Sequence, residues 1–302
     1  MARMTTTTNS NILNTEFFAK RWLEVLREEL LCLPLAVKEN APRNSGKQVA
    51  WTRMANTTAK TTPLSEGNDP PVPTDLVATV INATLQEFGA YFEPAKLFIS
   101  TAVSGTMTEI VEAAAHEAGI TLDTLCFTQA LQDTTDINDL SADLTAGALL
   151  VAAQTLNQNA AKAHRATPGG AFYAGIFSAN ALFEMANEGA PAWETVKRDD
   201  FAASWISPFK GTPVTAALYG ILPKISQNIQ NDGTDELNYV IADQGFGAVS
   251  IDGDMMAPRV IITNPEDRTD KPLRNSGTVG WWAAFASELL DSNQVVEILT
   301  TI

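Results

Sequence analysis

Two strand-like segments joined by a long polar connection place the strongest constraint on how this chain of 302 residues can fold. Residues 47–53 and about 75–92 are rich in Val, Ile, Thr and aromatic side chains, which favour strands. The connection, ANTTAKTTPLSEGNDPPVPT, is full of Thr, Pro, Gly and Asn and is long for a compact domain. Because an isolated two-stranded hairpin is only marginally stable, this hairpin must lie on another surface.

The stretch APRNSGKQVAWTRM leads into the first strand and contains the Gly-Lys pair of a phosphate-binding loop. Such a loop needs an earlier glycine, where Ala41 stands, and Ser or Thr after the lysine, where Gln48 stands. The residues after Lys47 read as a strand, whereas an anion site needs the N-terminal amides of a helix. We therefore predict a turn that enters the hairpin and no nucleotide site.

Elsewhere, helices and short strands follow one another without regular alternation or internal repeats, which predicts an α+β fold. Apolar periodicity predicts helices at Thr15–Leu31, 102–132, about 140–163, Ala179–Asn187 and Thr278–Leu290. Gly119 is a position where the second helix could bend or divide, and Ser141 or Asp143 is the expected cap of the third. Strands are expected at Phe172–Phe177, Asn238–Ile241, Gly247–Ile251, Arg259–Thr263 and Val295–Thr300, with a turn around 252–254 joining the third and fourth of these as a hairpin.

Composition narrows the classes of function. Hydrophobic residues make up 45% of the chain, enough for a sizeable core, and the formal net charge is −15. An acidic surface repels nucleic acid, which disfavours a protein that grips phosphate backbones. Cys32 and Cys126 lie far apart in apolar surroundings, which predicts buried thiols in a reducing compartment. With no signal core and no apolar run of spanning length, we expect a soluble cytoplasmic protein.

Residue types that carry catalysis form no recognisable pattern. His116 lacks a second histidine four positions on, and His164 is expected to be a favourable charge at a helix end. Asp252 and Asp254 could form a carboxylate pair, but the glycine and glutamate of a calcium loop are missing and a turn explains them. We predict no catalytic, cofactor-binding or metal residue.

The adjacent residues Trp281 and Trp282 are the most unusual hydrophobic feature. In a helix or a strand the two side chains point in different directions. We expect one to join the core and the other to meet a second layer or another subunit, since aromatic residues are enriched at interface centres. Stacking on bases or sugars is the alternative.

Three motifs in order carry a resemblance to a known family. They are NSGKQV from Asn44 with TPLSEG from Thr62, a helix over 109–125 that ends in AGITLDTL, and DKPLRNSGTVGW from Asp270. Together they resemble the major capsid proteins of tailed bacteriophages, in the branch of podophages similar to coliphage N-four, over residues from about 5 to 302. That family has the Hong Kong 97-like fold. The resemblance implies an N-terminal arm (1–46), an extended loop hairpin (47–92), a peripheral domain with a long spine helix (93–139), an axial domain (140–245) and a return to the peripheral domain (246–302).

The same resemblance implies a structural protein and not an enzyme. Its subunits would form hexamers and pentamers of an icosahedral shell around double-stranded phage DNA, without a cofactor, a membrane or sequence-specific DNA binding. The extended loop would lie across a neighbouring subunit, which explains a hairpin with no local partner. The expected subunit contacts are Phe18, Trp22, Trp51, Arg53, Leu64, Glu66, Trp281 and Trp282.

Portal, scaffolding and decoration proteins are the implied partners, and the virion is the implied location after synthesis in the host cytoplasm. Some relatives carry a lysine–asparagine crosslink, but no partner is marked for Lys60 and we predict none. The alternatives are an encapsulin-like compartment shell, an accessory (decoration) virion protein and a soluble cytoplasmic enzyme.

Overall fold

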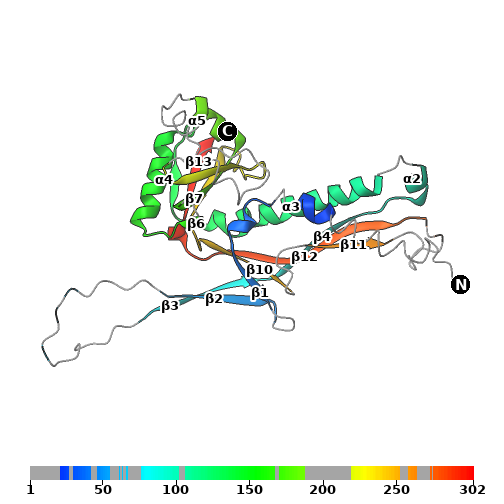
Figure 1. Cartoon of the computed structure of the whole chain (residues 1–302), viewed down its shortest axis with the longest axis horizontal. Helices are drawn as coiled ribbons and strands as arrows, with labels where there is room; N and C mark the ends of the chain where they lie inside the picture. Colours follow the sequence, from blue (N-terminus) through cyan, green and yellow to red (C-terminus); the bar gives the residue numbers. More distant parts are fainter. Residues whose placement is uncertain are drawn as a thin grey trace.

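Two large sheets, a two-stranded hairpin and one long helix organise an elongated molecule (Figure 1). The computed structural model describes residues 21–26, 30–41, 46–54, 61, 63, 66, 76–101, 106–166, 170–187, 219–251, 258–263, 273 and 275–302. Helices and strands mix without regular alternation along the chain, which confirms the α+β prediction.

The first sheet, here called the long sheet, is built around one strand. Its order is β1 (Val37–Ala41), β10 (Phe246–Ile251), β12 (Thr278–Leu289) and β11 (Arg259–Thr263), and β4 (Gln86–Phe92) also pairs with β12. β1 runs parallel to β10, and the other pairs are antiparallel.

Two predictions fail in the long sheet. The segment predicted as the helix Thr278–Leu290 is the strand β12, whose partners cover so much of it that its sequence, TVGWWAAFASEL, shows no polar alternation. The predicted hairpin of Gly247–Ile251 with Arg259–Thr263 is also wrong, because β10 and β11 each pair with β12 and not with each other. The expected turn at 252–254 lies outside the described residues.

Helix α3 (Thr106–Gln129) lies along one face of the long sheet, and α2 (Lys96–Thr101) stands at the end remote from the second sheet (Figure 1). Buried Val111, Ala114 and Ala118 of α3 pack against Val279 and Trp281 of β12. The small side chains let helix and sheet approach closely. The helix passes through Gly119 without a division.

The second sheet, here called the head sheet, has the order β5 (Ile137–Asp139), β13 (Val295–Thr301), β9 (Asp235–Ile241), β7 (Gly170–Phe177) and β6 (His164–Ala166). β8 (Ile221–Ile225) pairs in parallel with β7. The chain therefore returns after β12 to the head sheet through β13. The short 3-10 turns η1 (Leu33–Leu35), η2 (Leu131–Asp133) and η5 (Ser292–Gln294) lie in the connections.

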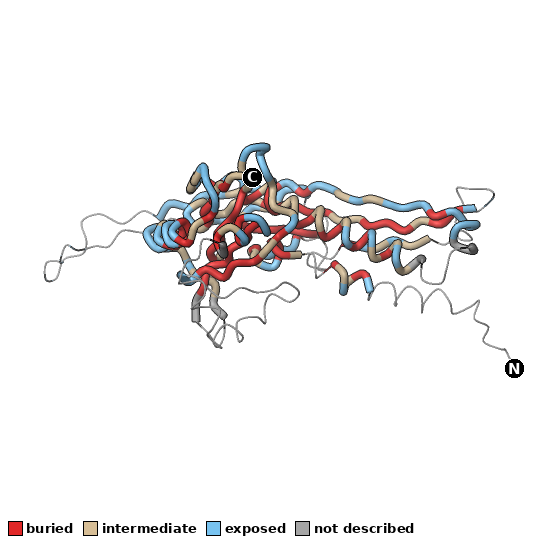
Figure 2. Tube along the Cα trace, turned by 90° about the horizontal axis from the view of Figure 1, so that it is seen from above, coloured by how far each residue is buried: buried red, intermediate tan, exposed pale blue. Residues whose placement is uncertain are grey.

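Helices α4 (Ala146–Gln158) and α5 (Ala179–Asn187) cover one face of the head sheet, and the last turns of α3 cover the other. The expected caps of α4 were wrong. Thr145 is the cap, and its Oγ1 accepts the Ala148 N–H at 3.1 Å, so the helix begins later than its apolar pattern. Figure 2 shows buried residues continuing from the head along the long sheet.

The hairpin projects from the side of the body opposite α3 (Figure 1). β2 (Gln48–Met54) pairs antiparallel with β3 (Ala78–Thr84) along their full length. Gly46, with a φ of 94°, precedes β2 and confirms the turn into the hairpin. The strand predicted at 75–92 is two strands, because Leu85 is buried and donates its N–H to the Lys47 carbonyl while the chain crosses from the hairpin to the long sheet.

Candidate subunit-interaction surfaces

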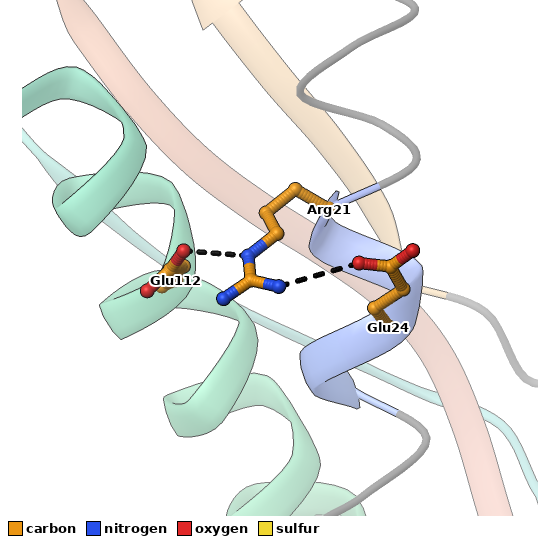
Figure 3. Close-up of polar contacts among 3 residues, drawn as sticks. All are labelled: Arg21, Glu24 and Glu112. Atoms are coloured by element: carbon orange, nitrogen blue, oxygen red, sulfur yellow. Dashed lines mark hydrogen bonds and ion pairs between the residues drawn. The ribbon is translucent and has the colours of Figure 1, made fainter. Parts of the chain in front are cut away.

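The helical residues 21–26 dock on the chain's own body. Trp22 and Leu26 are almost fully buried against α3 and the long sheet. Arg21 Nε donates to Glu112 Oε1 of α3 at 2.6 Å, and Arg21 Nη1 donates to Glu24 Oε2 at 3.3 Å (Figure 3). An amphipathic helix near a terminus can pack on its own domain or on a neighbouring chain, and the resemblance implied that Trp22 is a subunit contact. In the described part it packs on its own domain.

The predicted contact residues Trp51 and Arg53 lie at the root of the hairpin and bind the same chain. A Cβ atom on Gly247 would lie 2.7 Å from Trp51 Cζ2, so a glycine in β10 is what admits the indole. Arg53 forms an ion pair with Asp291 in the connection between β12 and β13. Asp291 also accepts the Asn293 N–H at 3.0 Å, which fixes its carboxylate for the arginine.

A polar cavity of about 680 Å³ lies beside this root, between the hairpin and the base of the head. Arg53 and Lys162 line it with positive charge, and Asp243 and Asp291 with negative charge. The opposite charges balance, so the cavity has no bias towards a charged ligand.

Trp281 and Trp282 point to opposite faces of β12, as predicted. Trp281 is buried among α3, Trp22 and the long sheet. Trp282 is half-buried on the outer face, where it lies directly opposite Gly89 of β4, and Tyr91 lies opposite Gly280. Each aromatic residue thus stands across the strand pair from a glycine, an arrangement that covers the bare backbone.

These residues line a largely apolar groove of about 450 Å³ on the outer face of the long sheet. Tyr91 is 70% exposed and Ile261 of β11 is 54% exposed, so the groove adjoins an uncovered apolar surface. We call it the outer groove. Of the residues that line the outer groove, the sequence singled out Trp281 and Trp282. Tyr91 and Ile261 were missed because nothing in their local sequence shows that this face of the sheet is uncovered.

Two further exposed apolar groups were also missed. Leu97 and Phe98 of α2 stand at the far end of the long sheet, and Leu273 is 84% exposed. On the head, Leu150 and Val151 of α4 are half-exposed, and Phe183 of α5 is 72% exposed. For the exposed residues on the head, the available sequence signal was a large apolar side chain on the outer side of a predicted helix.

Of the remaining predicted contacts, Glu66 is exposed. Phe18 and Leu64 lie outside the described residues, as does Lys60.

The two histidines do not form a site. His116 lies on the exposed side of α3, as expected for a helix-surface residue. His164 stands in β6 and not at a helix end, because α4 already ends at Gln158. Burial lowers the pKa of His164, and Asp243, 3.9 Å away, opposes that shift.

No three His, Cys, Asp or Glu side chains within the described ranges come together as a metal site. Among the described helices, none has both the length and the apolar content needed to cross a bilayer.

The structure of this chain resembles solved structures, whereas its sequence matches neither a family model nor a curated protein. No protein-family model matches the chain, and no curated protein matches it significantly. The structure matches the capsid of Ralstonia phage GP4 with a TM-score of 0.69 and 10% identity, over 88% of this chain and 87% of that one. It matches the acid-stable capsid of Helicobacter pylori bacteriophage KHP30 with a TM-score of 0.64 and 9% identity, over 88% and 87% of the two chains.

The chain has a Hong Kong 97-like fold. A virus-like particle from Pyrococcus furiosus also matches, with a TM-score of 0.54 and 10% identity, over 94% of this chain and 98% of that one. The match confirms the Hong Kong 97-like fold that the three sequence motifs implied, and the division into domains remains a prediction. The N-four-like branch remains a prediction.

Proposed function

We propose that this protein is the major capsid protein of a tailed bacteriophage and assembles into the icosahedral shell that encloses its double-stranded DNA. The observation that carries the proposal is the similarity to the GP4 capsid, which covers 88% of this chain and 87% of that one, so no part large enough to be a separate enzymatic domain is left over. The projecting hairpin, whose outward face carries the exposed Met54 and Val80, supports the same proposal.

In this proposal the described elements take the roles that the resemblance implied. The β2–β3 hairpin is the root of the extended loop, and α3 is the spine helix over the peripheral sheet. The head, with α4 and α5, is the axial domain. The strand β13 belongs to the axial sheet, so we place the end of the peripheral return near Asp291.

Subunit contacts are proposed at three surfaces. The first is the part of the hairpin beyond Met54, including Leu64 and Glu66. The second is the outer groove with Trp282, because an exposed apolar groove beside aromatic anchors suits a protein partner. The third is the segment that precedes residue 21, including Phe18. Weak contacts repeated over a closed shell add up to a stable particle.

The encapsulin-like alternative has the same kind of fold, and the virus-like particle from Pyrococcus furiosus fits the chain over most of its length. The three phage-type motifs favour the phage reading. Particle contents separate the two, since a phage shell made in infected cells holds DNA and a compartment shell holds protein cargo. We further propose that the chain has no catalytic role, that portal and scaffolding proteins assist assembly, and that the virion is its final location.

The first experiment is expression of the full chain, alone and with candidate scaffolding proteins, followed by negative-stain electron microscopy. Closed shells, tubes or hexameric rings are expected. A uniform small oligomer in every condition would contradict the proposal and favour the accessory or enzyme alternatives.

A deletion of residues 55–72 tests the loop assignment. The deletion variant should remain soluble and fail to close shells, because the paired root strands are kept and the distal contacts are lost. Replacement of the same residues by a Gly/Ser segment of equal length is the matched control, and it separates loss of contacts from loss of reach. Normal particles from both variants would show that the hairpin does not hold neighbours.

A further inference from the structure

A single buried carboxyl group fastens the segment 30–36 to α3. Asp123 of α3 is fully buried, and its Oδ1 accepts the Leu31 N–H at 3.1 Å and the Cys32 N–H at 2.7 Å. The segment has no strand partner here, since β1 begins only at Val37. Its other polar contacts include the Leu33 N–H, which also faces Asp123, and the internal bonds of η1, from Leu35 to Cys32 and from Ala36 to Leu33.

The rest of the attachment is apolar. Cys32 and Leu33 pack in the cluster that joins α3 to the head sheet, beside Cys126 of α3 and Tyr239 of β9. The segment therefore lies at the junction of the three main parts of the fold. Asp123 is the polar point that sets its position there.

The two oxygens of the carboxyl group are used unequally. Oδ1 accepts both N–H groups, whereas Oδ2 is buried without a hydrogen bond of ordinary geometry. A neutral carboxyl group keeps this arrangement, since a carbonyl oxygen accepts two bonds and the hydroxyl carries no charge. A carboxylate leaves part of its charge on a buried oxygen without a donor, which is costly.

The groups around Asp123 come from each packed element. Lys224 of β8 faces it from the head, the Asn228 side chain faces it from the loop after β8, and the Cys32 and Cys126 thiols lie nearby. Burial raises the pKa of Asp123 to about 6, although the hydrogen bonds from Cys32, Leu31, Asn228 and Leu33 favour the charged form. Burial also lowers the pKa of Lys224 to about 8, against the attraction of Asp123.

We propose that Asp123 is a proton-controlled clasp, which holds the segment 30–36 tightly when its carboxyl group is neutral and loosens when that group is charged. In the opened state, water reaches the carboxylate and removes the cost of burial. The charged clasp therefore opens more often, and the segment that leads to the N-terminal residues is held less firmly. On the proposed function, this segment is the root of the arm that reaches neighbouring subunits.

The size of the effect follows from the two protonation equilibria. A pKa of about 6 in the closed clasp and the ordinary 3.8 in the opened one predict that opening becomes about tenfold more frequent from about pH 5 to about pH 7.5. The sign is fixed because the closed state binds the proton more tightly. Lys224, with a pKa of about 8, keeps most of its charge up to about pH 7.5, so Asp123 dominates the change.

Hydrogen exchange on the unassembled full-length subunit tests the clasp without requiring a shell. Protection of the Leu31 and Cys32 amides, corrected for intrinsic exchange rates, should fall about tenfold between these pH values in the wild type. Asp123→Asn keeps an acceptor oxygen and carries no charge, so its protection should not change with pH. Asp243→Asn removes one negative charge near His164, outside the groups that surround Asp123, and should behave as the wild type.

PH-independent protection in the wild type would overturn the proposal, as would an unchanged pH dependence in Asp123→Asn. Equal flattening in Asp243→Asn would assign the effect to overall charge and overturn it as well. A subunit that shows the clasp but never forms shells would count against the proposed function and leave the clasp intact.

Discussion

Replacing Trp22 tests whether the start of the described chain is part of the subunit's own core. Trp22 is 1% exposed, and it packs with Leu26 against Val111, Ala114 and Trp281. Truncation of a fully buried tryptophan to alanine costs about 3–5 kcal/mol in lost transfer free energy and cavity formation. We expect Trp22→Ala to lower the unfolding free energy of the unassembled subunit by about this amount, as measured by urea denaturation at low protein concentration.

Two matched variants sharpen this test. The Trp22 Nε1 atom is buried without a hydrogen-bond partner, so Trp22→Phe removes no hydrogen bond and should cost clearly less than the alanine variant. Trp282→Ala removes the same side chain from the half-exposed outer groove and should also cost clearly less. If Trp22→Ala left the stability of the unassembled subunit unchanged and impaired only assembled particles, the reasoning would be refuted. Trp22 would then contact a neighbouring subunit, as the resemblance implied.

Three further perturbations follow from polar contacts. The wild type loses stability as pH rises through the raised Asp123 pKa of about 6, whereas Asp123→Asn has no group to titrate there. In urea titrations, the stability of Asp123→Asn minus that of the wild type should therefore be about 1.4 kcal/mol larger at about pH 7.5 than at about pH 5. The same difference at both pH values would contradict this. A double-mutant cycle of Arg53→Ala and Asp291→Ala should give a coupling energy of about 1 kcal/mol or less, because the arginine side chain is 40% exposed. This coupling energy should shrink in high salt, and a much larger, salt-insensitive value would contradict the prediction. Tyr239→Phe should lower the unfolding free energy by about 1–3 kcal/mol at about pH 8, because the Tyr239 hydroxyl donates to the buried Glu297 carboxylate at 3.0 Å. Burial raises the pKa of Glu297, so this carboxylate becomes neutral in acid and the loss should be smaller there.

The parts of the fold that the sequence predicted are those with a local signal. The hairpin strands carry β-branched residues between turn residues, and α3 has small and apolar residues at helical spacing. β12 was read as a helix because three strands and α3 bury it, so the alternation that marks a strand is absent. Pairings such as β1 with β10, which join residues far apart in the chain, leave no local pattern at all.

The candidate contacts divide for a similar reason. An amphipathic helix with Trp22 has the same pattern whether it packs on its own body or on a neighbour, so only the three-dimensional packing distinguishes the two. Asp123 reads as one of several polar residues in an amphipathic helix, and its role depends on backbone groups about ninety residues earlier in the chain. The outer groove was half-predicted, because Trp282 is conspicuous and Tyr91 is not.

On the proposed function, the two faces of the hairpin indicate where contacts to neighbouring subunits lie. Along β2, Val49, Trp51 and Arg53 are half-buried, and they turn towards the body, where Val249 and Ala286 cover Val49 and Trp51. The alternate residues face away, and Met54 of β2 and Val80 of β3 are more than half exposed. Because a strand cannot present one side chain to both faces, Trp51 and Arg53 fix the angle at which the hairpin leaves the body. Contacts to another subunit are then left to the outward face and to the residues beyond Met54, so substitutions at the root should change hairpin direction before they change any contact surface.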